Sequence, residues 1–424
     1  MEKYDIVVIG GGIAGSAAAL SAAREGSKVL LIERSNALGG TATNSLVIPF
    51  MPYHCTDPET KERFPLARGI FTEILDELKK CNCLYEYTDL EFDTSFNEEY
   101  LKVILNRLLL KAGVKLLFHS FLTECEVEGG HIKSVTVANK SGKQTFYADY
   151  FIDTTGDGDL AAMSGCDFRV GREEDSLCQP MTLCFRMGNV DVDKYVNEER
   201  ADAIKLYKEY KAAGKIKNVY EKILTFRTPS KGVLHFNSTR IVKKSPINAF
   251  DITEAEIEAR EQVFELVAFL KENVSAFKDA VLLSTATQIG VRESRMIEGE
   301  YTLGQEDLLA LARFEDSIAA CNYDMDIHNP EGSGTTHHYF KAGEYYTIPY
   351  RCLTPKKTDN LLVAGRCISV THEAQASIRI MPTCFCTGQA AGIAAAVAAN
   401  HKTDVKSIDI KEVQQKLKAA NAFF

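Results

Sequence analysis

The sequence lacks the features of several large classes of protein. None of its 12 cysteines forms a CxxC or CxxxxC pair, which argues against disulfide reductase chemistry and against an internal iron–sulfur relay. No cluster of Lys or Arg offsets the net charge of -9, which argues against nucleic acids and anionic membranes as partners. The chain also has no internal repeat, low-complexity tract or long linker. We therefore expect small molecules as partners.

The sequence also lacks an uninterrupted apolar run that could cross a membrane, because Gly388, Gln389 and Gly392 interrupt its alanine-rich C-terminal stretch. A strand-like segment begins at residue 4, which leaves no room for a signal peptide before it. We expect a cytoplasmic protein with no membrane partner and with reduced, mostly buried cysteines. The two CxC pairs would place their thiols on opposite faces of a strand, so they do not favour a structural metal.

The most informative stretch runs from Asp5 to Glu33, where DIVVIG is followed by GGGIAG, an alanine-rich segment and KVLLIE. This order predicts a strand, a phosphate-binding turn, a helix and a second strand. Gly10 permits the tight turn, Gly12 lets the backbone approach a pyrophosphate at the helix N-terminus, and Gly15 lets the helix pack on the strand. The Glu33 carboxylate can accept hydrogen bonds from both ribose hydroxyls. The pattern predicts a dinucleotide whose ribose carries no extra phosphate.

Periodicity predicts the elements that follow. Apolar residues at helical spacing predict helices around 70–78 and 104–109, the second preceded by an Asn97 cap. Residues 114–118 read as a strand, and residues 121–151 read as an antiparallel meander with Gly-containing turns. The meander ends in FIDTTGDGDLAA, which predicts a strand that runs into a glycine-bearing turn and a helix.

The pattern changes in the middle of the chain. Residues 166–349 mix short strands with polar helices, including a helix around 254–271 whose Val263, Phe264, Val267 and Leu270 are expected on its apolar side. We expect an α/β protein. Residues 1–165 and 350–424 would form a discontinuous Rossmann-like domain with a parallel sheet plus the meander. Residues 166–349 would form an inserted mixed α+β substrate or cap domain.

Five separated segments resemble the FAD-dependent oxidoreductases with the glutathione-reductase-type FAD fold. They are GGGIAG with Glu33, LGGTAT, DTTGDGDLAA, IGVRESRMIEGEYTL and LLVAGRCISVTHEAQASIRIMPTCFCTGQAAGIAAA. The resemblance is closest to flavoproteins related to the flavin-binding part of heterodisulfide reductase, and more distant to fumarate reductase flavoproteins. It covers both ends of the chain well and the middle thinly. It implies one bound FAD, and the single GxGxxG agrees because no separate nicotinamide domain is encoded.

The resemblance also implies which residues contact FAD. The matching positions are Gly10, Gly12 and Gly15 at the pyrophosphate; Glu33 at the adenosine ribose, followed by Arg34 as a further cofactor-binding residue; Gly39, Gly40, Thr41 and Ala42 at the phosphate and flavin side; Leu122 at the adenine; Gly156 and Asp157 in the second turn; Gly365 and Arg366 at the ribityl chain; and Gly388, Gln389, Ala390 and Ala391 in the helix that faces the flavin pyrimidine. The sequence departs from its relatives at Arg366, where they carry an acid. A helix dipole at the pyrimidine would stabilise the negative charge of the reduced flavin.

Two arginines are candidates for substrate binding. Arg292 and Arg295 lie three residues apart in GVRESR, so they would share one face of a helix or flank a turn. Paired guanidinium groups suit the bidentate binding of a carboxylate. The alternative is a structural ion pair with Glu293, Glu298 or Glu300.

His372, Arg379 and Cys384 lie close to the second flavin-binding strand and the helix after it. We hypothesise that His372 transfers a proton, because imidazole titrates near neutral pH, and that Arg379 binds substrate or flavin. The alternatives for His372 are a histidine satisfied by hydrogen bonds and a covalent attachment point for the flavin. Cys384 is either a reactive thiol at the helix N-terminus or, as we favour, a packing residue.

Three further histidines, His328, His337 and His338, surround the glycine-rich run NPEGSGTTHH. No acid or thiol completes a recognisable ligand spacing around them, so we predict no metal site. A substrate loop is the functional alternative and a solvated loop the simpler one.

These observations lead to one principal hypothesis. We expect a FAD-dependent oxidoreductase that transfers a hydride between the flavin ring and a small organic molecule, which could be anionic, at the junction of the two domains. Nicotinamide, quinone, oxygen and ferredoxin are the candidate electron donors or acceptors. The alternative is a flavin-bearing electron-transfer subunit that needs an iron–sulfur or ferredoxin partner. A FAD-binding protein without redox function is a third, less favoured possibility, because flavoproteins of this type usually use the ring.

Overall fold

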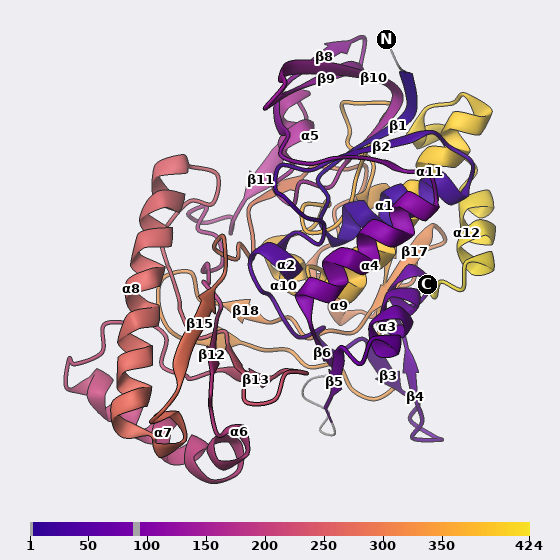
Figure 1. Cartoon of the computed structure of the whole chain (residues 1–424). Helices are drawn as coiled ribbons and strands as arrows, with labels where there is room; N and C mark the ends of the chain where they lie inside the picture. The colour runs from indigo at the N-terminus through magenta and orange to yellow at the C-terminus, as the bar shows by residue number, and fades with distance from the viewer. Residues whose placement is uncertain (1–2, 88–93) are drawn as a thin grey trace.

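A seven-stranded sheet is the largest sheet in a computed structural model that describes residues 3–87 and 94–424, and it lies in the upper part of Figure 1. Its strands follow the order β7–β2–β1–β10–β9–β8 in space, with β21 also paired to β10. Their bounds are β1 Lys3–Ile9, β2 Val29–Ile32, β7 Lys115–Leu117, β8 Phe121–Glu128, β9 His131–Asn139, β10 Gly142–Asp153 and β21 Leu361–Val363. The expected α/β fold is confirmed.

Strand β10 joins the two parts of this sheet. Its first half pairs with β9 in the antiparallel meander β8–β9–β10. Its second half pairs in parallel with β1, so that Asp153 lies beside Ile9, and with β21 on its other side. Strands β1, β2, β10 and β21 therefore run in the same direction and end at the same edge of the sheet. This edge is where ligands bind in open parallel sheets.

Two helices of small residues cover one region of the sheet. Helix α1 (Ile13–Arg24) packs directly against α11 (Met381–His401). A Cβ atom on Gly388 would lie 2.2 Å from the Ala14 carbonyl oxygen, and one on Gly392 would lie 2.1 Å from the Ala18 carbonyl oxygen. The two backbones can approach this closely only because both positions are glycine.

Two of the expected helices are present. Helix α3 spans Ile70–Lys80, and helix α4 spans Glu98–Lys111. The Asn97 side chain accepts a hydrogen bond from the Glu99 backbone N–H, so the expected N-cap of α4 is confirmed.

The middle of the chain forms a second layer around a four-stranded antiparallel sheet in the order β13–β14–β12–β15. Its elements are β12 Phe185–Gly188, β13 Thr225–Arg227, β14 Leu234–Phe236, β15 Val281–Thr285, α7 Arg200–Ala212 and α8 Ala249–Asn273, which lie together on the left of Figure 1. The sequence placed Phe264 on the apolar side of α8, and this was wrong. Its side chain is 61% exposed, because Phe264 is rotated by about 100° around the helix from Val263, which lies on the buried face.

The shorter elements complete the chain. They are α2 Thr41–Asn44, β3 His54–Thr56, β4 Arg63–Pro65, β5 Leu84–Glu86, β6 Thr94–Phe96, α5 Asp159–Met163, β11 Phe168–Val170, α6 Val192–Lys194, a π-helical turn Tyr195–Glu199, β16 Arg295–Ile297, α9 Gln305–Leu309, β17 Ser317–Cys321, β18 Ile327–His328, β19 Thr335–Thr336, β20 Tyr346–Pro349, α10 His372–Ile378 and α12 Ile410–Ala419, with 3₁₀ turns at Ser275–Phe277, Tyr350–Cys352 and Val405–Ser407.

The buried apolar side chains form two large clusters. The larger cluster joins the central sheet with both ends of the chain and also takes in buried residues between 296 and 353. The second cluster contains residues between 181 and 289, together with Leu46. We propose a division into two structural units on this basis, with the second unit shorter than the 166–349 expected from sequence pattern.

Helix α11 is, among the described residues, the single helix that is long and apolar enough to cross a membrane. Every residue of its most apolar window is buried inside the fold. Its apolar character is therefore used in packing against α1 and the sheet.

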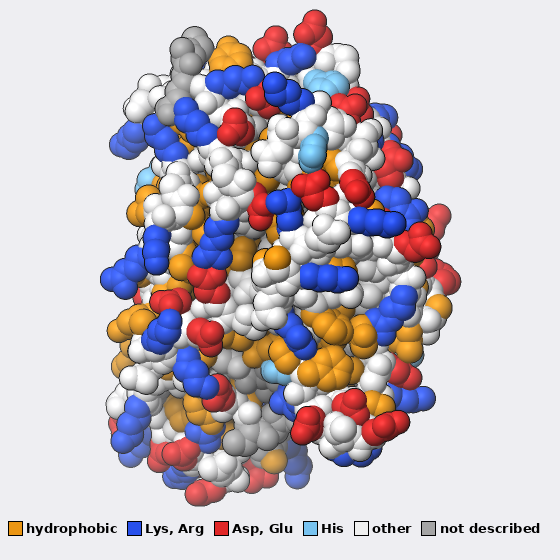
Figure 2. All heavy atoms as spheres, turned by 90° about the vertical axis from the view of Figure 1, so that its right-hand side faces the viewer, with side chains coloured by type: hydrophobic (Ala, Val, Ile, Leu, Met, Phe, Trp, Pro, Cys, Tyr) orange, Lys and Arg blue, Asp and Glu red, His pale blue; other side chains and the backbone are white. Residues whose placement is uncertain are grey.

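The face that carries α3 and α12 has no dominant charge sign in the part that is described. Figure 2 shows Lys and Arg side chains interspersed with Asp and Glu across it. The concentration of one charge sign that matters for function lies inside the molecule, as described below.

We expect Gly388→Ala to destabilise the fold by about 1–3 kcal/mol, because the new methyl group would overlap the Ala14 carbonyl in the packed α1–α11 interface. Urea unfolding monitored by circular dichroism measures the change. Gly332→Ala is the matched control, since a Cβ atom there meets nothing within 4 Å. Equal stability of the two variants would contradict the packing argument.

Candidate functional site

A cavity of about 450 Å³ opens at the edge where the parallel strands end. The residues that follow β1, β2, β10 and β21 line it, namely Gly10, Glu33, Arg34, Thr154, Thr155, Gly156, Asp157, Ala364, Gly365 and Arg366. The cavity continues to the second unit, where Thr182, Cys184, Tyr220, Leu224, Phe226, Asn237 and Arg292 line it. We call its two extremes the Glu33 end and the Arg292 end.

The Glu33 end is built around one carboxylate. Glu33 Oε2 accepts a hydrogen bond from the Gly11 N–H at 2.5 Å, and Oε1 accepts from the N–H and hydroxyl of Ser35 at 2.7 and 2.6 Å. The Glu33 side chain is buried and lines the cavity. The exposed Arg34 and the buried Leu122 also line it. These contacts fix an acidic acceptor at the position where the sequence pattern expects a ribose.

The glycine turn leaves room for a ligand at one position and none at the others. A Cβ atom on Gly15 would lie 1.8 Å from the Gly10 carbonyl oxygen, so α1 packs tightly on the turn. A Cβ atom on Gly12 would meet only the Gly40 Cα, at 3.8 Å. The open space over Gly12 lies at the N-terminus of α1, which suits a pyrophosphate. The residues present therefore fit the phosphates of FAD.

The segment after β2 closes over this turn. The Gly39 N–H donates to the Gly11 carbonyl at 2.8 Å, and Gly40 precedes the short helix α2. Of the four residues expected near FAD in this segment, Thr41 lines the cavity and Gly40 borders the open space over Gly12. Gly39 and Ala42 are not among the residues that line the cavity.

The turn after β10 depends on an acid that the sequence reasoning did not single out. The buried Asp153 accepts hydrogen bonds from the N–H and hydroxyl of Thr155 and from the Ala161 N–H. Burial raises the pKa of Asp153 to about 6. The signal was present as the first Asp of DTTGDGD, since an acid at a strand end commonly caps the turn that follows.

The Arg366 side chain holds this second turn in place through hydrogen bonds. Its guanidinium donates to the Gly156 carbonyl at 2.8 Å, to the Asp157 carboxylate at 2.6 Å and to the Val291 carbonyl. Asp157 also accepts a hydrogen bond from the Ser294 hydroxyl at 2.8 Å. Arg366 and Asp157 thus tie the first unit to the segment that carries Arg292, and both line the cavity.

The part of α11 that faces the cavity differs from the expected one. Helix α11 begins at Met381, and Ile380, Met381 and Cys384 line the cavity. Gly388, Gln389, Ala390 and Ala391 lie about two turns further on and are buried away from it. Gly388 packs on α1, while the Gln389 side chain accepts a hydrogen bond from the Ile70 N–H. Burial raises the pKa of Cys384 to about 12, which fits a packing thiol.

Arg292 and Arg295 do not form the expected pair. Arg292 donates to the Pro180 carbonyl and the Thr182 hydroxyl and faces the cavity. Arg295 opens strand β16 and forms an ion pair with Asp159 at 2.9 Å. The segment is extended rather than helical, so side chains three residues apart point to opposite sides. Arg295 thus has an ion-pair partner, but one that the sequence analysis did not name.

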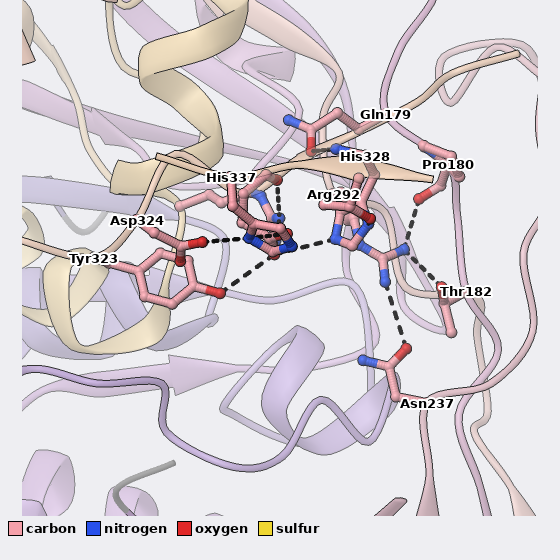
Figure 3. A network of polar contacts seen from close by, with 12 residues as sticks. Gln179, Pro180, Thr182, Asn237, Arg292, Tyr323, Asp324, His328 and His337 are labelled. Carbon is pink, nitrogen blue, oxygen red and sulfur yellow. Dashed lines mark hydrogen bonds and ion pairs between the residues drawn. The ribbon is translucent and has the colours of Figure 1, made fainter. Parts of the chain in front are cut away.

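The Arg292 end gathers charged residues from distant parts of the chain (Figure 3). Arg379 lies 3.5 Å from the Asp326 carboxylate, and Asp326 lies 3.2 Å from His328 Nε2. Burial and the nearby Arg292 lower the pKa of His328 to about 3, so its ring is neutral. Burial opposes the charge of Asp326, yet His328, Arg379 and Arg292 hold its pKa below the usual range.

Arg240 holds the His328 ring in position. Its guanidinium donates to the Gly332 and Gly334 carbonyls in the turn between β18 and β19, and to His328 Nδ1 at 2.9 Å. Because Nδ1 accepts this bond, the ring proton of the neutral His328 lies on Nε2 and points to Asp326. The glycine-rich run is therefore a hairpin that positions His328 at the cavity.

His337 lies beside two acids that the ligand spacing in the sequence did not reveal. Its Nδ1 is 2.6 Å from Asp324 and 3.8 Å from Asp326, and the three side chains could together hold an ion. Arg379 lies against Asp326 and opposes a cation there. This group is explained as a pair between His337 and Asp324.

His372 lies at the start of α10, outside the residues that line the cavity. Its Nδ1 lies 2.8 Å from the fully buried Glu293 carboxylate, which also accepts a hydrogen bond from the Gln179 N–H. Burial opposes the charge of His372, but the bond to Glu293 raises its pKa overall. The geometry favours the hydrogen-bonded alternative over proton transfer.

Tyr220 is a cavity residue that the sequence reasoning missed. Its ring stacks under the Arg240 guanidinium, 4.5 Å from the centroid, and its hydroxyl has no hydrogen-bond partner among the described residues. It lies in an irregular segment between α7 and β13, where no periodicity marks it. No sequence signal could have identified it.

Comparisons with known proteins identify relatives for this architecture. Residues 5–417 match the family described as FAD dependent oxidoreductase. The FixC protein of Azotobacter vinelandii is 26% identical over 154 residues, which is 34% of each chain. The dihydrolipoamide dehydrogenase of Chaetomium thermophilum is 44% identical over 66 residues, 14% of this chain and 13% of the relative. The chain thus matches about a third or less of the length of these curated relatives.

A solved structure of a geranylgeranyl bacteriochlorophyll reductase-like protein from Thermoplasma acidophilum is 14% identical, with a TM-score of 0.49 over 99% of this chain and 84% of that one. The flavin-dependent brominase Bmp2 is 13% identical, with a TM-score of 0.49 over the same shares.

We expect Glu33→Gln to weaken FAD binding by at least about tenfold, because an amide group would face the Gly11 or Ser35 donors in place of a charged acceptor. Quenching of FAD fluorescence on reconstitution of the apoprotein measures the dissociation constant. Glu128→Gln, on the exposed end of β8, is the control. Unchanged affinity in Glu33→Gln would show that this carboxylate does not serve the cofactor.

We expect His372→Leu to lose about 3 kcal/mol of stability at pH 5.5, because Glu293 would stay buried without its cationic partner. The folded-state pKa of His372 is raised, so its contribution is complete below the unfolded value of about 6.5 and declines as the pH rises through the folded value. Thermal unfolding from pH 5.5 to 9 measures this. If the stability difference between wild type and His372→Leu does not shrink at high pH, the linkage to His372 protonation is refuted. His401→Leu, which removes a histidine from an exposed pair with Glu412, is the control.

Proposed function

The chain belongs to the family of FAD-dependent oxidoreductases, and on that premise we propose that it transfers a hydride between FAD and a small organic substrate at the Arg292 end of the cavity. One observation carries the proposal: a single cavity runs from Glu33, past the open space over Gly12, to Arg292. A cofactor held by its ribose and phosphates in the first unit would share this cavity with a substrate held by the second unit.

The first unit supplies the groups that would hold FAD. Glu33 would accept hydrogen bonds from the ribose, and the turn at Gly12 would cradle the phosphates at the N-terminus of α1. The N-terminal turn of α11, with Met381 and Cys384, lies along the same cavity and presents the positive end of its dipole. When bound, FAD supplies a ring that accepts and donates hydride.

The Arg292 end supplies the groups that would hold the substrate. Arg292 and Arg379 both line this end and favour an anionic molecule. Leu224, Phe226 and Ile252 form apolar walls beside them, which would exclude water from the reacting atoms. We include a cytoplasmic location in this proposal, because α11, the one helix of the described residues that is long and apolar enough to cross a membrane, is enclosed in the core.

Tyr220 is the best-placed group for proton transfer. Oxidation of an alcohol or of a carbon–carbon bond by hydride loss also releases a proton, and the reverse reduction consumes one, so a side chain that exchanges this proton with the substrate would assist the reaction. Both ring nitrogens of His328 are engaged, and the Tyr323 hydroxyl donates to Asp326. The Tyr220 hydroxyl is free in the described residues, and burial raises its pKa, so it holds its proton at neutral pH.

Spectroscopy of the purified protein tests the function. We expect a flavin absorption band and, after anaerobic reduction, reoxidation by at least one member of a panel of unsaturated acids, quinones, amines and hydroxy acids. A colourless protein that cannot be reconstituted with FAD would refute the proposal. A flavin that changes redox state only with an iron–sulfur or ferredoxin partner would instead support an electron-transfer subunit.

We expect Tyr220→Phe to slow the substrate-dependent redox change of the flavin by about 10²-fold or more, while the FAD content stays unchanged. Stopped-flow absorbance in H₂O and D₂O measures the rate and its solvent isotope effect, which should disappear in the variant. Tyr323→Phe removes a neighbouring hydroxyl that is bonded to Asp326 and serves as the control. A Tyr220→Phe rate within twofold of the wild-type rate would contradict a role of Tyr220 in proton transfer.

A further inference from the structure

The Arg292 guanidinium faces the cavity without an acidic partner. It donates to the Pro180 carbonyl at 2.7 Å, to the Thr182 hydroxyl at 2.6 Å and to the Asn237 amide oxygen at 3.4 Å (Figure 3). All three acceptors are neutral. No carboxylate of the described residues forms an ion pair with Arg292. Its hydrogen bonds therefore go only to neutral dipoles, and the Asp326 carboxylate acts on it from beyond ion-pair distance.

Two neighbouring arginines add to the positive charge at this end of the cavity. Arg240 is also bonded to neutral acceptors, and Arg379 has only a 3.5 Å contact with Asp326, while its Nε is buried without a partner. Among the described residues, Asp326 is the one carboxylate within ion-pair distance of any of these three guanidinium groups. Glu221 acts on Arg240, and Asp324 acts on Arg379, from further away. Burial, followed by repulsion from Arg379 and Arg240, lowers the pKa of Arg292 to about 10. A cation in such a site is stabilised most by an anion that the protein itself does not provide.

The geometry of Arg292 selects the kind of anion. Its two strong bonds both leave from Nη1, so the edge formed by Nε and Nη2 carries only the long bond to Asn237. That edge can donate two parallel hydrogen bonds, which matches a carboxylate.

The side chains around this edge determine what kind of group the ligand can carry beside its carboxylate. Tyr220, Leu224, Phe226, Pro246 and Ile252 line the same end of the cavity and offer mainly carbon surface. The one further carboxylate on this wall belongs to Glu256. Its Oε1 accepts a hydrogen bond from the Ile289 N–H at 2.6 Å, and its Oε2 lies 3.0 Å from Arg260 in an ion pair but has no hydrogen-bond partner among the described residues. A second anionic group placed against Leu224, Phe226 or Ile252 would lie on carbon without a donor.

We propose that the Arg292 end binds a monocarboxylate with an apolar body, whose carboxylate lies on the Nε–Nη2 edge of Arg292 and whose body lies against Leu224, Phe226 and Ile252. This inference rests on the proposed function and names the substrate class for the same site. Uncharged molecules of the same shape lose the ion pair, and small dicarboxylates place their second charge on the apolar wall.

The test uses the FAD-loaded protein and three probes, benzoate, trans-cinnamate and hexanoate. Perturbation of the flavin absorbance and isothermal titration calorimetry measure their binding. We expect at least one probe to bind about tenfold or more tightly than both its matched alcohol and fumarate. Binding is measured without turnover, so the result does not depend on finding the true substrate.

Variants of Arg292 tie the binding to this residue. We expect Arg292→Met to weaken the binding of the probe by about tenfold or more at unchanged FAD content. Arg292→Lys should retain part of the wild-type affinity, since the lysine ammonium keeps the charge but not the two-donor edge. Arg351→Met, which removes an exposed arginine paired with Asp316, is the matched control and should bind like wild type.

Each outcome decides the proposal. Failure of all three carboxylates to bind the FAD-loaded wild type, equal binding of the alcohols, or preference for fumarate would overturn it. Unchanged probe affinity in a folded, FAD-containing Arg292→Met protein would overturn it as well. A protein that takes up no FAD would contradict the proposed function instead, and the flavin absorbance separates the two failures.

Discussion

The structure depends on the close contact between the turn after β1 and the end of β10. A Cβ atom on Gly10 would lie 2.5 Å from the Thr154 carbonyl oxygen, and the Thr154 hydroxyl donates to the carbonyls of Ile9 and Gly10. This contact aligns the ends of the parallel strands at one edge of the sheet. The open space over Gly12 and the carboxylate of Glu33 have fixed positions because the backbone beneath them cannot shift.

The two ends of the cavity have opposite electrostatic character. Glu33 provides a carboxylate acceptor at one end, held by backbone donors from its own unit. Arg292, Arg379 and Arg240 provide excess positive charge at the other end, with Asp326 as their one shared acid among the described residues. A molecule that joins the two ends would meet hydrogen-bond acceptors for its hydroxyls first and donors for an anion last. This polarity gives the cavity a direction along which cofactor and substrate are distinguished.

Sequence reasoning succeeded where the determinants are local. The glycine frame, the meander turns and the Asn97 cap follow from backbone conformations and short-range hydrogen bonds. It failed where a side chain's direction depends on distant packing. Phe264 follows helical periodicity yet faces solvent, Arg295 turns away from Arg292 in an extended segment, and the small residues after Gly388 serve helix packing instead of the cavity.

The sequence by itself determined the α/β fold, the N-terminal dinucleotide turn and the family, because each is encoded by spacing within a few tens of residues. Only the tertiary structure decided the composition of the Arg292 end. Arg240, Arg292, Asp326, His328 and Arg379 come from separate loops and strand ends, and their positively charged cluster exists only after the two units pack together. No local pattern specifies it, because the energy of a buried charge depends on which distant groups surround it.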